Sequence, residues 1–179
     1  MRHLRRSNTF QFITCKTFLD QQYFNTDTKK QIIKNQIAKA VERFHLHNYA
    51  YSIVSNHLHQ LFFLENRNDL PKIIQIIQGG SSYKLNKNLR CEGRIWARYY
   101  NRIIWSPDKF AIFNVIGYII GNPLKHGVVK SFQELKGYKF CSYYQFTKMY
   151  GDKRAEQLVR SVLGFDDEEN IENILEYKK

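Results

Sequence analysis

The spacing of apolar residues changes several times along this chain, and each change marks a predicted element. Residues 8–19, 49–54 and 58–64 are rich in aromatic and β-branched side chains, which is typical of strands. Between the first two, apolar residues recur every three or four positions and predict a helix over about 27–46. The short turn at residues 55–56 indicates that the second and third strands pair antiparallel.

The second half of the chain continues with helix, strand and helix. Pro71 stands in the first turn of a predicted helix, which Gly79 and Gly80 are expected to break or bend. Residues 95–105 form a fourth predicted strand. The Ser-Pro-Asp cluster of residues 106–108 then starts a helix that we expect to end at about Gly121, before Pro123.

The predicted order is β-α-β-β-α-β with C-terminal helices, including an amphipathic one near 152–163. This order is typical of a ferredoxin-like (RRM-like) α+β fold, in which helices pack on one face of an antiparallel sheet. We therefore expect the other face to be open for a site. No Gly/Ser-rich or Pro-rich linker divides the chain, so we expect one domain over 1–150, followed by a C-terminal helix and acidic tail over 151–179.

Positive charge is concentrated outside the tail. The formal net charge is +12, but residues 166–179 hold six acids and two lysines, which leaves 26 basic and 10 acidic side chains before them. Such an excess attracts polyanions, so nucleic acid is the expected partner. Tyrosine and phenylalanine are abundant, and Tyr99 and Tyr100 lie between Arg98 and Arg102, which suits stacking on unpaired bases.

The cysteines and the apolar runs indicate a cytoplasmic protein without a membrane partner. Three widely spaced cysteines argue against a disulfide framework and against a cysteine zinc site. The basic N-terminus is not followed by a secretory apolar run, and the apolar stretch 110–120 is too short to span a bilayer.

His57 and His59 are the first residues that suggest chemistry. On a strand, residues i and i+2 point to one face, so both imidazoles would share the open face and could ligate one cation. Two partly exposed strand histidines without a metal are the alternative. His45 and His47 have the same spacing, but they fall at a predicted helix end where side chains diverge, so we expect no site there.

Tyr118 and Asn122 are four residues apart on a predicted helix and therefore lie on one face of it. An amide oxygen is a suitable third ligand for a hard cation, and two imidazoles with one amide leave places for phosphate oxygens. The phenol of Tyr118 could then attack the phosphate, helped by a divalent metal such as Mg²⁺ or Mn²⁺. A tyrosine packed in the core is the alternative.

Taken together, these motifs resemble those of the single-tyrosine HUH transposases, the IS200-like group, and in particular the REP-associated tyrosine transposases. The family pattern Pro-Asn-His-apolar-His is matched at residues 55–59, with Ser55 in place of proline, and Tyr-Ile-x-x-Asn-Pro is matched at residues 118–123. Residues 76–83 and 95–102 resemble the helix and strand between them. Asn101 and His126 depart from the residues common at those positions.

The resemblance implies cleavage of single-stranded DNA near a hairpin, through a 5′-phosphotyrosine intermediate that allows rejoining. It carries over the metal site to His57, His59 and Asn122 and the nucleophile to Tyr118. It favours a monomer, with a homodimer as the alternative. Five further residues are candidates for DNA contact: Lys84, Arg98, Tyr100, Arg102 and Lys125.

Two other classes of function stay open. One is a nucleic-acid-binding module on the same fold that carries out no chemistry. The other is a metal-dependent hydrolase in which water replaces Tyr118 as the nucleophile.

Overall fold

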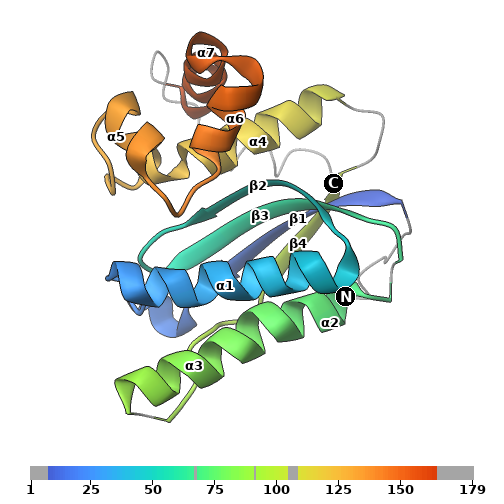
Figure 1. Ribbon diagram of the computed structural model, residues 1–179, viewed down its shortest axis with the longest axis vertical. Helices are drawn as coiled ribbons and strands as arrows, with labels where there is room; N and C mark the ends of the chain where they lie inside the picture. Colours follow the sequence, from blue (N-terminus) through green and yellow to red (C-terminus); the bar gives the residue numbers. More distant parts are fainter. Residues whose placement is uncertain (1–7, 67, 91, 105–108, 165–179) are drawn as a thin grey trace.

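A four-stranded antiparallel sheet forms the centre of the computed structural model, which describes residues 8–66, 68–90, 92–104 and 109–164 (Figure 1). The strands lie in the order β2-β3-β1-β4. Each pair of neighbours is antiparallel, as the ferredoxin-like order requires, so the predicted fold class is confirmed. The strand bounds are β1 Thr9–Lys16, β2 His47–Ile53, β3 His57–Leu64 and β4 Tyr100–Ile104.

One face of the sheet is covered by α1 (Asp27–Phe44), α2 (Leu70–Ile74) and α3 (Gly80–Leu89). The Thr26 hydroxyl caps α1 by accepting a hydrogen bond from the backbone of Lys29, so the helix begins where the sequence predicted. The second predicted helix is not broken at its glycine pair, because a π-helical turn over Gln75–Gly79 joins α2 to α3. A side chain at Gly80 would collide with Gln36 of α1, so glycine lets the two helices approach.

The other face is covered as well, which corrects the expectation that helices pack on one face only. α4 (Lys109–Lys125) lies across β2 and β3, and α5 (Phe132–Gly137), α6 (Tyr143–Tyr150) and α7 (Asp152–Leu163) lie beyond it (Figure 1). Phe12 and Leu61 of the sheet share one apolar cluster with Ile116 and Ile119 of α4. α4 is apolar on nearly all sides, so it needs the sheet on one side and another helix on the other.

α4 also runs through Pro123 instead of ending before it. Proline lacks a backbone N–H, so one hydrogen bond is missing within the last turn. The Pro123 carbonyl nevertheless accepts hydrogen bonds from the backbone N–H groups of Val128 and Val129, at 2.9 and 3.3 Å, and these close the turn that follows. The predicted start signal at residues 106–108 and the acidic tail lie outside the described residues.

The fourth strand is shorter than the predicted 95–105. Trp96 makes only an isolated bridge to Thr17 before β4 begins at Tyr100. Its indole N–H donates a 2.8 Å hydrogen bond to the Ser81 hydroxyl, and its ring packs on Phe24 at 4.8 Å between centroids. This segment is therefore held by side-chain contacts and by two backbone hydrogen bonds near the end of β1, from Ala97 to Lys16 and from Phe18 to Ile95, instead of by a continuous strand ladder. Within the described ranges, no helix is long and apolar enough to cross a bilayer.

Candidate active site

His57 and His59 lie side by side on the sheet face that α4 covers. Their ring centroids are 4.8 Å apart. The side chains are only 6% and 5% exposed, which corrects the expectation of an open face. The pair is therefore enclosed between the start of β3 and α4.

Hydrogen bonds fix the orientation of both imidazoles. His57 Nδ1 lies 2.8 Å from the amide oxygen of Asn56, and His59 Nδ1 lies 2.9 Å from the hydroxyl of Thr14. An Nδ1–H that donates to an amide oxygen leaves the lone pair of the ring on Nε2. Metal-binding histidines commonly use one nitrogen for such a bond and the other for the metal. The Asn56 oxygen can only accept, so it favours the His57 tautomer with a free Nε2, whereas the Thr14 hydroxyl can donate to or accept from His59.

Asn122 of α4 is completely buried, yet neither its Oδ1 nor its Nδ2 atom has a hydrogen-bond partner of ordinary geometry within the described residues. An unpartnered buried amide costs stability, so such a group commonly has a function. The amide faces His57, where it partly opposes the lowering of the pKa of that imidazole. These observations fit Asn122 as a third ligand beside the histidine pair.

Burial keeps both imidazoles neutral. It is the main cause that lowers the pKa of His57 to about 3, and the positive charges of His126, Lys16 and Lys125 add to it. The pKa of His59 is also lowered, first by burial and then by His57. Neutral imidazoles can bind a cation without losing a proton first.

The candidate ligands carry no negative charge. In the part of the chain that the structure describes, no group of three or more His, Cys, Asp or Glu side chains could hold a metal. Two imidazoles and one amide would leave the charge of a divalent cation uncompensated. Such a centre suits a ligand that brings its own negative oxygens, as a phosphodiester does.

Tyr118 stands one helical turn before Asn122, and its ring reaches the histidines. Its centroid is 5.2 Å from that of His59 and 6.2 Å from that of Phe12. The ammonium group of Lys125 lies 4.9 Å from the centre of the same ring. The side chain is only 4% exposed. The structure therefore brings the phenol ring, the histidine pair and the buried amide together.

Exposed cations surround the approach to this group. Lys16 at the end of β1 is the register partner of His57, and Lys125 ends α4. The exposed His126 packs its ring against His57 with centroids 4.7 Å apart. Sequence reasoning missed Lys16, Thr14 and Asn56. Only the strand register assigns the first two to the site, whereas Asn56 could have been found as the neighbour of His57.

The candidate DNA-contacting residues divide between two sides of the molecule. Tyr100 and Arg102 are register partners of Thr14 and Phe12, so they share the sheet face of the histidines. The Tyr100 side chain is 77% exposed, and Arg98 just before it is exposed too. Lys84 is exposed on α3, in the layer that covers the opposite face. The structure therefore does not bring Lys84 to the histidine pair.

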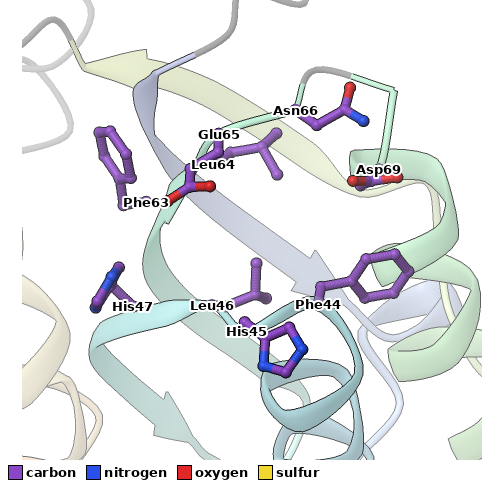
Figure 2. A pocket seen from close by; sticks show the side chains of 9 residues that line it. All are labelled: Phe44, His45, Leu46, His47, Phe63, Leu64, Glu65, Asn66 and Asp69. Atoms are coloured by element: carbon purple, nitrogen blue, oxygen red, sulfur yellow. The ribbon is translucent and has the colours of Figure 1, made fainter.

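A pocket lies at the other end of β3, where α1 ends and β2 begins (Figure 2). It is lined by His45 and His47 together with Phe63, Leu64 and Asp69, among others. Figure 2 shows the two histidine rings apart, on either side of Leu46. This pocket is separate from His57 and His59, which lie at the start of the strand.

Comparison with known proteins identifies the family. Residues 9–122, from the first residue of β1 to Asn122, match the family described as IS200-like transposases. The chain belongs to this family. Transposases bind DNA and act in DNA transposition, so the transposase has DNA as its partner.

One solved structure of a transposase agrees with the fold of this transposase, and a second aligns only weakly. A REP-associated tyrosine transposase, described as bound to a REP hairpin, aligns at a TM-score of 0.65 and 20% identity, covering 81% of this chain and 82% of that one. A putative transposase from Deinococcus radiodurans R1 aligns at a TM-score of only 0.41 and 13% identity, covering 63% of this chain and 90% of that one. No curated protein matches the sequence.

Proposed function

We propose that this transposase cuts and rejoins single-stranded DNA by transesterification, with Tyr118 as the nucleophile. One observation carries the proposal: the Tyr118 ring lies 5.2 Å from His59, one helical turn from the buried amide of Asn122, which has no hydrogen-bond partner of ordinary geometry in the part of the chain that the structure describes. A tyrosine, a histidine pair and an orphaned amide have no structural need to meet in one place. Their meeting is explained if they serve a reaction on phosphate.

In this proposal His57, His59 and Asn122 hold a divalent metal ion, Mg²⁺ or Mn²⁺. When bound, the cation polarises the phosphate and offsets the charge that develops during attack. Imidazole ligands favour Mn²⁺ over Mg²⁺. The exposed ammonium groups of Lys16 and Lys125 lie close enough to affect the pKa of His57, and they are suited to bind phosphate oxygens beside it.

The proposed reaction exchanges one phosphate ester bond for another, so it needs no external energy source. The phenol oxygen of Tyr118 forms a bond to phosphorus while the bond from phosphorus to the 3′ oxygen breaks. The phenol loses its proton, and the departing strand gains one to end in a 3′ hydroxyl. The product is a 5′-phosphotyrosine ester, and attack by a 3′ hydroxyl reverses the step and joins the strands without ATP.

The proposed substrate is single-stranded DNA close to a hairpin. The structure of similar fold is described as bound to a REP hairpin. The exposed ring of Tyr100, next to Arg98 and on the histidine face, is suited to stack on an unpaired base. β3 and α4 of one chain supply both histidines, the amide and the tyrosine, which favours a monomer.

A second candidate is a DNA-binding module that carries out no chemistry, and the burial of Tyr118 favours it. A ring that is 4% exposed and packed on Phe12 is also what a core tyrosine looks like. Under this alternative the protein binds DNA but leaves it intact. A hydrolase that uses water instead of Tyr118 would cut DNA without becoming attached to it.

Incubation with stem-loop single-stranded DNA and Mn²⁺, followed by a denaturing gel and peptide mapping, separates the three functions. We expect a covalent adduct on Tyr118 and its complete loss in Tyr118→Phe. The substitution removes one hydroxyl and should lower stability by only about 1 kcal/mol, so folding and DNA binding serve as internal controls. An adduct mapped to another tyrosine would refute the assignment. Cleavage by Tyr118→Phe without an adduct would indicate the hydrolase, and intact DNA with the wild type would indicate the binding module.

A further inference from the structure

α7 packs against α4 on the side away from the sheet (Figure 1). Among the described helices, this pair has the most extensive contact. Ala155, Val159 and Val162 of α7 are buried in the apolar cluster that also contains Tyr118. α7 lies beyond residues 9–122, which the family match covers.

Two glycines of α4 make this contact possible. A Cβ at Gly117 would lie 2.9 Å from Val162 Cγ2, 3.0 Å from Leu158 Cγ and 3.2 Å from the Leu158 carbonyl oxygen. A Cβ at Gly121 would lie 2.8 Å from both Val159 Cγ1 and Leu163 Cδ1. Neither glycine has the positive φ that would itself require glycine, so close packing is the reason for them.

The residue after each glycine belongs to the candidate active site. Tyr118 follows Gly117, and Asn122 follows Gly121. Successive helical residues point about 100° apart, so the glycine pair faces α7 while Tyr118 and Asn122 face the histidines. Any rotation or outward shift of α4 caused at the glycines therefore moves the phenol and the amide.

We propose that α7 is a positioning element for the reaction: its close contact at Gly117 and Gly121 sets the rotation and depth of α4 that bring Tyr118 and Asn122 to the histidine pair. This inference rests on the function proposed above. It makes the two glycines positioning residues, although neither can touch substrate.

The surroundings of the two glycines predict an order of effects. A methyl group at Gly117 meets the backbone of Leu158, so the helices must separate by a few tenths of an ångström. The three atoms nearest to a methyl group at Gly121 all belong to the side chains of Val159 and Leu163, which can move more readily than a backbone carbonyl. Alanine favours helix more than glycine, so helix propensity alone predicts no loss. Gly117→Ala should therefore impair the reaction more than Gly121→Ala.

The test uses the full chain and measures the single-turnover rate of adduct formation at saturating stem-loop DNA, the DNA Kd and the Mn²⁺ Kd. For Gly117→Ala we expect a rate lower by about tenfold to a hundredfold, weaker Mn²⁺ binding, and a DNA Kd within about twofold of wild type. Gly137→Ala is the matched control, because a Cβ there meets no atom within 4 Å. Adding Val162→Ala to Gly117→Ala removes one clash and should restore part of the rate.

Unchanged rate and Mn²⁺ affinity in folded Gly117→Ala, even with a lower Tm, would overturn the proposal and leave α7 a merely stabilising helix. If Gly117→Ala does not fold, the milder Gly121→Ala carries the same test. If the wild-type chain binds Mn²⁺ but forms no adduct, Tyr118 is not the nucleophile, while the proposal for α7 still stands. The Mn²⁺ affinities of wild type and Gly117→Ala then decide that proposal alone. A wild-type chain that forms no adduct and binds no Mn²⁺ would overturn both.

Discussion

Replacing Asn122 by leucine should separate a metal ligand from a structural amide, because the two roles predict opposite changes in stability. The Asn122 side chain is fully buried, and neither of its polar atoms has a hydrogen-bond partner of ordinary geometry among the described residues. An unsatisfied buried polar group costs about 1–3 kcal/mol. Leucine has the same γ-branched shape without polar atoms, but it is larger. We therefore expect Asn122→Leu to raise the free energy of unfolding by about 1 kcal/mol in the absence of metal, the lower end of this range.

With metal bound, the wild type should be more stable than Asn122→Leu. A cation at about 100 times its Kd stabilises the wild type by about 2.7 kcal/mol. If the loss of a ligand raises the Kd about a hundredfold, the same concentration stabilises Asn122→Leu by only about 0.4 kcal/mol. The variant would then be about 1 kcal/mol more stable than wild type in EDTA and about 1 kcal/mol less stable in Mn²⁺.

Thermal unfolding in EDTA and in excess Mn²⁺ measures this reversal. For a chain of this size, 1 kcal/mol corresponds to about 2–4 °C in Tm. Gln78→Leu is a matched control, because the Gln78 Nε2 atom is also buried with no hydrogen-bond partner of ordinary geometry among the described residues, but it lies in the helical layer on the other face. Gln78→Leu should change the Tm by the same amount in EDTA and in Mn²⁺. If Asn122→Leu is destabilised in EDTA yet keeps the full Mn²⁺ effect, Asn122 is not a ligand.

Three further predictions test the histidines and the DNA. His57→Ala combined with His59→Ala should abolish cleavage and Mn²⁺ binding but retain most DNA affinity in a binding assay, because phosphate contacts supply that affinity. Tyr100→Ala should weaken binding of single-stranded DNA by about 1–3 kcal/mol, and a perfect duplex should be cut more slowly than a hairpin-bearing single strand. Without metal, unfolding experiments should show stability falling as the pH drops from 6.5 toward about 3, because unfolded His57 takes up a proton over this range while folded His57 stays neutral. His57→Gln should flatten that fall, and an unchanged pH dependence would contradict the lowered pKa of His57.

The sequence predicted those features that depend on local periodicity. α1 and α7 begin at the expected residues because their apolar positions recur regularly and polar residues mark their starts. The shared face of His57 and His59, and of Tyr118 and Asn122, also follows from the repeat of a strand and of a helix. The fold class followed from the order of these elements alone.

Features that depend on long-range packing could not be predicted in the same way. The apolar sequence of α4 indicated burial but not the surface that buries it, so the second face of the sheet was expected to be open. Aromatic residues favour strands, so Trp96 was expected in β4, yet it makes only an isolated bridge to Thr17 and its indole donates a hydrogen bond to Ser81 of α3. Lys16 lies at the site only because β1 and β3 pair in a register that places Lys16 opposite His57. Neither strand sequence alone predicts that register.

The covered face also determines how the proposed chemistry could work. α4 buries the histidines, so they remain neutral, and it brings the phenol and the amide to them from the opposite side. A phosphate therefore cannot descend onto an open sheet. In the proposed reaction it enters from the end of the sheet where Lys16 and Lys125 are exposed, beside the last residue of β1 and the last residue of α4. A single strand can bend into this end of the sheet with one base on Tyr100 more easily than a stiff duplex, so the enclosure supports the proposal of a single-stranded substrate.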